Sequence, residues 1–307
     1  ATGNVLTNDS DIDGGALTVT QFVWNGVTTT AGSTATVASV GTLVIAGNGA
    51  SGVVIDGAAT TGTLLRGNWI GLDAAGNARG NAQAGVFLST SAVNNTIGGT
   101  AAGAGNTIAY NGWDGIRLSG AGTGKAFLGN SLYGNVEQAI DIGAQGVTLN
   151  DADDPDSGGN NLQNFPQLTL ARTNGSNQLT LNGTLDSSAN TWFRIEFFAN
   201  SAQDGSGYGE GQTFLGSALV QTNASGDATI STTLTANVAA GSFISATATQ
   251  TNAGETAHTN TSEFARNVYA LPLVQGALVV DTTNDVVDGD ATSISTLLAN
   301  KGADGFI

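Results

Sequence analysis

Gly105-Asn106-Thr107-Ile108 is the stretch that decides the fold, because close variants of it return along the first half of the chain. The variants read Gly67-Asn68-Trp69-Ile70, Asn94-Asn95-Thr96-Ile97 and Gly129-Asn130-Ser131-Leu132. The step from Gly105 to Gly129 is 24 residues. A period in the low twenties, with short β-prone runs and glycine-rich corners, is typical of a solenoid whose coils stack on one another.

A second phrase alternates with the first. It reads Gly85-Val86-Phe87-Leu88, Gly115-Ile116-Arg117-Leu118 and Ala139-Ile140-Asp141-Ile142. We expect the aliphatic side chains to fill the interior of the coils, and the asparagines to stack at a turn and pair their amides from rung to rung. The two phrases together predict a short right-handed parallel β-helix over residues 46–149, with about 22 to 25 residues in each of roughly four coils.

The later part of the chain changes from this long period to simple alternation of apolar and polar residues. The alternating runs are Leu179–Leu185, Trp192–Phe198, Thr229–Leu234 and Phe243–Ala248. Such runs, separated by turn residues, are typical of half-buried strands. Residues 166–270 are therefore predicted to form an antiparallel β-sandwich, and the whole chain is predicted to be all-β.

The amino-acid composition and net charge exclude several classes of protein and of partner. The 307 residues include 45 Gly, 8 Lys and Arg, 24 Asp and Glu, one His, and no Cys or Met. Hydrophobic residues make up 40%, which excludes a disordered chain. The net charge of −16 argues against nucleic acid and anionic membranes as partners, and it favours divalent cations. No apolar run is long enough to predict insertion into a membrane.

Two acidic segments are candidate calcium sites. Asp9, Asp11 and Asp13 precede Gly14 in the opening segment, residues 1–45. The segment 150–165 carries a denser group: Asp151, Asp153, Asp154 and Asp156. Closely spaced carboxylates repel one another unless they are solvated or neutralised, and several of them can converge on one hard cation. The alternatives are an acidic turn whose aspartates accept backbone hydrogen bonds, and a solvated hinge.

The chain also resembles a known class of proteins. The Asn8-Asp9-Ser10-Asp11-Ile12-Asp13-Gly14 segment resembles the start of the cadherin-like repeat domains of bacterial adhesins. The coil phrases, the Leu162–Pro166 linker and the strand Phe193–Phe198 resemble the β-helical repeats with the "CSLREA" signature and the sandwich that trails them. Residues 271–307 resemble the start of a further module of that kind. The resemblance implies a secreted or cell-surface bacterial protein.

Two interpretations of this order of modules remain open. The chain is either an excerpt of a longer tandem protein or a subunit that joins copies of itself head to tail. In the second case the contact is expected at Leu278, Val279 and Val280 near one end and at Val5 and Leu6 near the other. The partners are then copies of the chain, or adjacent modules of a longer one.

Three functions fit the sequence. The expected one is a non-enzymatic, calcium-stabilised structural unit of a bacterial surface or extracellular fibre. The alternative is an adhesin module that binds surface glycans through Trp69, Tyr110, Trp113 and Tyr133, which otherwise pack the coil corners. The third is a polysaccharide lyase or hydrolase that uses Asp114 and Asp141, about one coil apart; otherwise Asp114 is a turn residue and Asp141 faces solvent. His258 is expected to be exposed in a loop.

Overall fold

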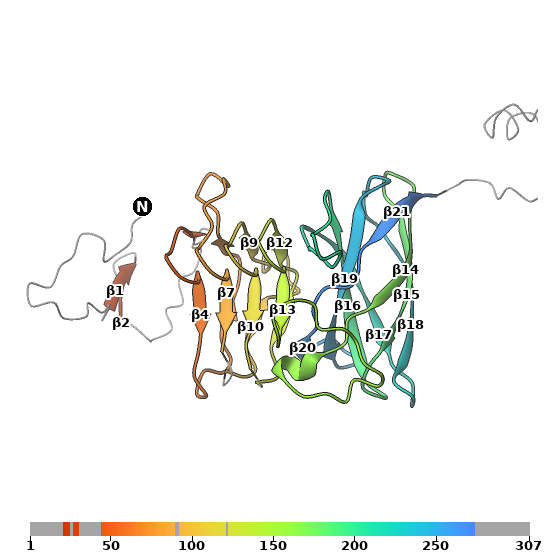
Figure 1. Ribbon diagram of the computed structural model, residues 1–307, viewed down its shortest axis with the longest axis horizontal. Coiled ribbons are helices and arrows are strands. Elements are labelled where there is room, and N and C mark those ends of the chain that lie inside the picture. Colours follow the sequence, from red (N-terminus) through yellow and green to blue (C-terminus); the bar gives the residue numbers. More distant parts are fainter. Residues whose placement is uncertain (1–20, 25–26, 31–43, 90–91, 121, 274–307) are drawn as a thin grey trace, which may run out of the picture. The chain divides into compact units, whose positions relative to one another are not determined.

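The computed structural model describes residues 21–24, 27–30, 44–89, 92–120 and 122–273. The first two segments form an antiparallel hairpin of β1 (Gln21–Trp24) and β2 (Val27–Thr30), which belongs to a unit of its own. The described residues from 44 to 273 belong to a second compact unit, drawn from orange to blue in Figure 1. The expected all-β fold, a short parallel β-helix followed by a β-sandwich, is confirmed.

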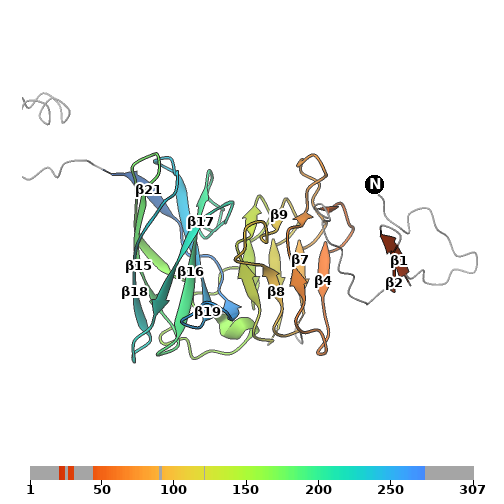
Figure 2. The same ribbon diagram turned by 180° about the vertical axis from the view of Figure 1, so that it is seen from behind.

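Three parallel sheets run along the β-helix (Figures 1 and 2). The first contains β4 (Val53–Ile55), β7 (Val86–Leu88), β10 (Ile116–Leu118) and β13 (Ile140–Ile142). The second contains β5 (Leu64–Leu65), β8 (Thr96–Gly98) and β11 (Ala126–Leu128). The third contains β3 (Val44–Ile45), β6 (Trp69–Ile70), β9 (Thr107–Ala109) and β12 (Ser131–Tyr133). The phrase that opens on Gly85 forms the first sheet, and three copies of the asparagine phrase form the third.

The coils are less uniform than the sequence predicts. Stacked asparagines of successive coils are separated by 33, 30 and 24 residues. Only the last step has the expected length. One reason is an excursion between β6 and β7, where Leu72 and Ala78 form an isolated antiparallel bridge. Extra residues of this kind are accommodated at a coil corner without changing the register of the stacked strands.

Side chains of the first sheet alternate between the interior of the β-helix and its outer face. Ile116 and Leu118 are fully buried inside the coil, whereas Arg117 between them points outward and is partly exposed. The interior cluster consists mainly of aliphatic side chains from the coils, including Val86, Ile97, Ile108 and Leu132. Burial of each such side chain stabilises the fold by about 1.5–3 kcal/mol, an upper value before chain entropy is subtracted.

Asparagines form two ladders along the β-helix. The expected one runs through Asn68, Asn106 and Asn130, whose side-chain amides donate to the next oxygen at 2.9 Å. A second ladder runs through Asn48, Asn81, Asn111 and Asn135. The sequence analysis missed it, although each member lies four residues before the glycine or alanine that directly precedes a strand of the first sheet. Asn95 is not in either ladder; it accepts from the amide of Thr63.

The sandwich contains eight strands in one curved sheet. They are β14 (Gln167–Thr173), β15 (Leu179–Asp186), β16 (Trp192–Asn200), β17 (Thr213–Gln221), β18 (Asp227–Leu234), β19 (Phe243–Thr251), β20 (His258–Thr261) and β21 (Val268–Pro272). The order is β17-β16-β19-β21-β14-β15-β18, with β20 paired to β19. The pairings are antiparallel except that between β14 and β21. The end strands β17 and β18 also contact each other, so the sheet nearly closes around its core.

The sandwich closes the C-terminal end of the β-helix. Phe198 and Phe264 of the sandwich belong to the same buried cluster as Leu132 and Ile142 of the last coil. The two phenyl rings pack edge to face, with their centroids 5.2 Å apart. Leu132 and Gly211 exchange two backbone hydrogen bonds of 2.9 and 3.0 Å. The hydrophobic interior of the solenoid is therefore plugged at this end rather than open to water.

Candidate functional site

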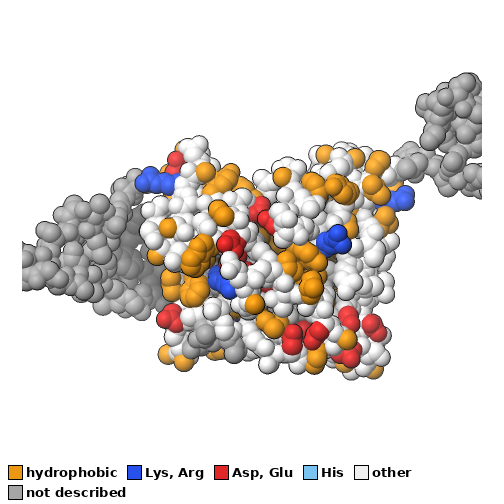
Figure 3. All heavy atoms as spheres, viewed as in Figure 1, with side chains coloured by type: hydrophobic (Ala, Val, Ile, Leu, Met, Phe, Trp, Pro, Cys, Tyr) orange, Lys and Arg blue, Asp and Glu red, His pale blue; other side chains and the backbone are white. Residues whose placement is uncertain are grey.

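The acidic segment between β13 and β14 gathers three of its four aspartates. The carboxylates of Asp151, Asp154 and Asp156 each offer an oxygen, and these oxygens all lie within 4.8 Å of one another. The carboxylate of Asp153 is outside this group, and its backbone amide donates to Asp186 Oδ1 at 3.1 Å. Figure 3 shows acidic side chains along the lower border of this face, over the segment that follows β13. We refer to Asp151, Asp154 and Asp156 as the linker carboxylates.

Neighbouring amide side chains hold the segment in shape. Asn150 and Phe165 exchange two hydrogen bonds of 2.8 and 3.0 Å, which join the two ends of the segment. Asn164 donates its side-chain amide to the carbonyl oxygens of Asp151 and Asp186, at 2.8 and 2.9 Å. The segment also contains η1 (Gly159–Leu162), a short 3₁₀ turn. These hydrogen bonds fix the backbone of the linker against the end of β15. The positions of the three carboxylates are therefore set by the fold of the linker.

Asp154 is the buried member of the group. Its carboxylate accepts from Gln163 Nε2 at 2.8 Å, from the amide of Asn164 at 3.2 Å and from Ser187 Oγ. Burial is the main cause that raises the pKa of Asp154 to about 6; the Asp156 and Asp151 charges contribute to this rise, and the hydrogen bonds from Ser187 and Asn164 oppose it. Burial and then the Asp151 charge raise the pKa of Asp156. Among the described residues, the buried Oδ1 atom of Asp156 has no hydrogen-bond partner.

This donor set fits a hard divalent cation. Calcium takes oxygen ligands, commonly from several carboxylates in a loop, and its charge would offset the mutual repulsion of the linker carboxylates. An unpartnered, buried carboxylate oxygen on Asp156 is the feature that such an ion would satisfy. The other candidate ligands, Asp9, Asp11 and Asp13, lie outside the described residues. So do the expected self-association residues Val5, Leu6, Leu278, Val279 and Val280.

Asp114 and Asp141 do lie near each other, but neither faces solvent. Asp141 is fully buried on the outer face of β13, opposite Arg117 in the parallel register, and the two side chains form an ion pair. Asp114 is 3% exposed and its Oδ2 lies 3.7 Å from Arg117 Nη1. The guanidinium also donates to the carbonyl oxygen of Gly143 at 3.1 Å. Burial, followed by the Asp141 charge, raises the pKa of Asp114 to about 6.

Three glutamates of the sandwich, here called the junction glutamates, accept hydrogen bonds from the last coil. Glu196 accepts from the amide of Gly129 at 2.8 Å. Glu210 accepts from the amides of Gly134 and Asn135, at 2.7 and 3.3 Å. Glu263 accepts from the amides of Ile142 and Thr148, at 2.8 and 2.9 Å. Sequence reasoning missed all three, because nothing in an alternating strand marks a carboxylate that will face another domain.

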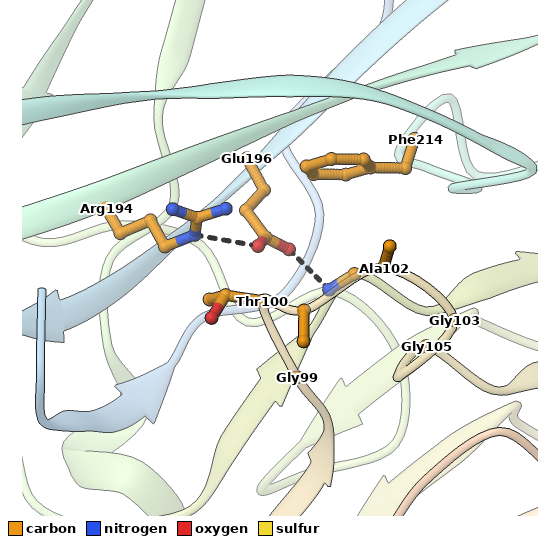
Figure 4. A pocket seen from close by; sticks show the side chains of 10 residues that line it. Gly99, Thr100, Ala102, Gly103, Gly105, Arg194, Glu196 and Phe214 are labelled. Carbon is orange, nitrogen blue, oxygen red and sulfur yellow. Dashed lines mark hydrogen bonds and ion pairs between the residues drawn. The ribbon is translucent and has the colours of Figure 1, made fainter.

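A cavity of about 150 Å³ lies beside one junction glutamate. Figure 4 shows Glu196 between Arg194 and the loop that contains Gly99, Thr100 and Ala102, with Phe214 above. Arg194 Nε donates to Glu196 at 2.9 Å, and Arg194 Nη1 donates to Glu255 at 2.8 Å. The charged groups along this cavity are therefore already paired with one another.

The histidine and the corner aromatic residues named in the sequence analysis lie in the following places. His258 lies in β20 and is half-buried, not exposed in a loop; burial lowers its pKa. Tyr110 packs edge to face on Tyr133, with centroids 5.4 Å apart. Trp113 and Tyr110 remain 44% and 38% exposed. Within the described part of the chain, no helix is both long and apolar enough to cross a membrane.

No family model matches the chain, and no curated protein matches it at a significant level. What the protein does is therefore inferred from the geometry of its own residues.

Proposed function

We propose that the protein is a non-enzymatic structural unit of a bacterial cell-surface or extracellular fibre, with a scaffold or adhesive role. The observation that carries this proposal is the continuity of hydrogen bonding along the molecule. The ladder from Asn48 through Asn81 and Asn111 reaches Asn135, whose backbone amide donates to Glu210 of the sandwich. A load applied along the stack is then shared by rung-to-rung bonds and passed to the next domain, which is a mechanical function.

The acidic pair supports a structural rather than a catalytic role. General acid–base cleavage of a polysaccharide needs carboxylates that reach a bound sugar. Asp114 and Asp141 are 3% and 0% exposed, and both hold Arg117. Their arrangement is that of a buried ion-pair network that fixes β10 to β13.

Calcium is proposed as the stabilising ion of the linker. Bound to Asp151, Asp154 and Asp156, it would neutralise their repulsion and stiffen the segment that joins the two domains. The proposed fibre forms head to tail through the terminal segments that contain Val5, Leu6 and Leu278–Val280. The proteins that the chain resembles, with cadherin-like and CSLREA-type modules, supply the expected location: secreted, at the bacterial surface or in the extracellular matrix.

Electron microscopy of the full chain tests the assembly and the ion together. The expected result is uniform filaments in calcium that loosen in a chelator, with spacing that matches one copy of the chain. Discrete monomers at every protein concentration would overturn head-to-tail assembly. Filaments that do not respond to chelation would overturn the role of calcium in holding them.

Glycan binding is the second candidate, favoured by two exposed aromatic side chains. Tyr110 and Trp113 lie on either side of the corner formed by Asn111 and Gly112, and both are more than a third exposed. Stacked sugars quench or shift the fluorescence of a contacting tryptophan. Titration of the chain and of Trp113→Ala with surface polysaccharides should show a saturable change in the first protein only; no change in either would exclude this site.

A further inference from the structure

The strand β21 carries two large apolar side chains on the outer face of the sandwich. Ala270 is fully buried in the core, whereas Tyr269 and Leu271 on either side of it are 57% and 48% exposed. Phe243 of β19 packs against Tyr269, with the ring centroids 4.8 Å apart. We refer to Phe243, Tyr269 and Leu271 as the β21 patch.

The patch lies on an inner strand of the sheet, because β21 is placed between β19 and β14 (Figure 1). A sheet face that meets water normally carries polar side chains. The strands beside the patch follow this rule: Arg172 of β14 is opposite Leu271, and Thr180 of β15 is opposite Arg172. Apolar side chains gathered next to these polar neighbours indicate a surface that a further segment covers.

The next part of the chain begins beside this patch. Leu273 is the last residue of the described range, and its amide donates to the carbonyl oxygen of Thr173 at 2.6 Å. The apolar segment Leu278–Val280 starts five residues further on, after Gly276, which is a residue type that turns favour. Five residue steps span at most about 18 Å, and Leu271 is only two residues before Leu273. The segment is therefore long enough to turn back onto the patch.

The spacing of the segment matches that of the patch. In an extended chain, side chains two residues apart point to the same side and lie about 7 Å from each other. Leu278 and Val280 have this separation in the sequence, and so do Tyr269 and Leu271. Two apolar side chains of the segment can thus meet two of the strand in one antiparallel alignment.

Charge favours the same segment. Arg172 lies beside the patch and Arg266 lies two residues before β21; neither forms an ion pair with another residue in the described ranges. The chain has a net charge of −16 and 8 basic residues, so two cations near one patch favour an acidic occupant. Asp281 directly follows Val280 and supplies a carboxylate.

We propose that the β21 patch binds the segment Leu278–Val280 of the same chain, folded back across the outer face of the sandwich. Leu278 and Val280 contact the patch, and Val279 between them faces water. The docking itself does not depend on fibre formation. A consequence that does rest on the proposed function is that the patch holds the segment in a single copy until a second copy takes it up.

The reactivity of single cysteines in the full chain tests the docking. The chain contains no Cys, so Val280→Cys and Val279→Cys each introduce one thiol. A thiol covered by the patch reacts with a water-soluble maleimide when the segment undocks. We expect Val280→Cys to react about tenfold more slowly than Val279→Cys, because burial of one apolar side chain shifts an equilibrium by about that factor or more. The difference should not change with protein concentration.

Substitutions in the patch identify the docking surface. Leu271→Ser or Tyr269→Ser, each combined with Val280→Cys, should raise the reaction rate to that of Val279→Cys. Both side chains are about half exposed, so neither change removes a core residue. Val136→Ser is the matched control, since it removes an apolar side chain of the β-helix that is 72% exposed, and it should leave the tenfold difference as it is.

Three outcomes would overturn the proposal. The first is equal rates for Val279→Cys and Val280→Cys, and the second is a slow reaction of Val280→Cys that persists in both patch variants. The third is protection that develops only as the protein concentration rises, which would assign the patch to a second copy. The electron microscopy of the fibre does not use these rates, so docking and fibre formation can fail separately.

Discussion

Asn111 Nδ2 donates to Asn135 Oδ1 at 2.9 Å, and both side chains are buried at the same corner of successive coils. Asn111 Oδ1 in turn accepts from the backbone amide and the side-chain amide of Asn81, at 3.2 and 2.8 Å. One side chain thus joins three rungs of the β-helix. A buried amide without its partner costs about 1–3 kcal/mol, so the ladder is a main determinant of coil stacking.

We therefore expect Asn111→Ala to destabilise the protein by about 3 kcal/mol, because it removes the acceptor of two Asn81 donors and the side-chain bond to Asn135, which keeps only the backbone amide of residue 111. The free energy of urea unfolding, followed by circular dichroism, measures the loss. Asn237→Ala is the matched control, since Asn237 is exposed at the end of the sandwich. Equal stability of the two variants would contradict a stabilising role of the ladder.

The glycines at coil corners give a second prediction. A Cβ atom on Gly71 would lie 1.8 Å from the carbonyl oxygen of Ala109, and the residue has φ of +89°. Gly62 has a similar φ of +72°, but no described atom lies within 4 Å of its Cβ position. Gly62→Ala should cost only the backbone strain of about 1–2 kcal/mol.

Gly71→Ala has to move the next coil as well, and we expect a loss of more than about 4 kcal/mol, or failure to fold. Thermal unfolding of the two variants side by side separates backbone strain from lack of space. If both lose the same stability, the close approach of Gly71 to the next coil is not important for the fold.

The sequence predicts the features that repeat in every coil, such as the glycine and asparagine residues at the coil corners. Gly67, Gly105 and Gly129 recur before an asparagine, and the structure places all three at the same corner. Coil length was predicted less well. An excursion such as Leu72–Ala78 adds residues between two repeating phrases but leaves the phrases themselves unchanged, so the phrases do not reveal it.

The joint could not be predicted from the sequence. Glu263 and Ile142 are 121 residues apart, and their contact depends on how the sandwich is placed on the last coil. Burial of Asp141 was not predicted either, since the alternation along β13 directs its side chain outward, where it pairs with Arg117 and accepts from the amide of Gly146 in the loop after the strand. The linker carboxylates were foreseen as a group, but the exclusion of Asp153 from it depends on backbone turns that composition does not specify.

A buried lysine gives a third prediction. Lys125 is 0% exposed, and its ammonium group donates to the carbonyl oxygen of Gly122. Burial lowers the pKa of Lys125 to about 8. Because this value lies below the 10.5 of the unfolded chain, the charged form is destabilised at neutral pH, and stability should rise as the pH goes from 8 to 10.5.

Lys125→Met keeps the length of the side chain and removes the charge, so we expect it to stabilise the protein at pH 7 by on the order of 2 kcal/mol. The gain should shrink towards pH 10, where the lysine itself becomes neutral. Melting temperatures of both proteins at the two pH values test this. A variant that is less stable than the original at pH 7 would show that the bond to Gly122 outweighs the burial of the charge.

The linker carboxylates give the last prediction, in which calcium reverses the sign of a mutation. Asp156 Oδ1 is buried without a partner among the described residues, and the Asp151 charge opposes ionisation of this side chain. In chelator, Asp156→Asn should therefore raise the melting temperature, because it removes a charge that the fold does not compensate. In millimolar calcium the same variant should melt below the original protein, which gains about 2.7 kcal/mol when the ion is present at a hundred times its dissociation constant.

Protons compete with calcium for Asp154, so the stabilisation by calcium should depend on pH. The pKa of Asp154 without the ion is raised from 3.8 to about 6, so in chelator its contribution to stability falls as the pH rises through that window. Calcium binds the charged form, and the rise in melting temperature that it causes should be larger at pH 7.5 than at pH 5. Asp153→Asn is the matched control, because its carboxylate lies outside the group and its backbone bond to Asp186 is kept. An equal response to calcium in Asp156→Asn and Asp153→Asn would place the ion elsewhere.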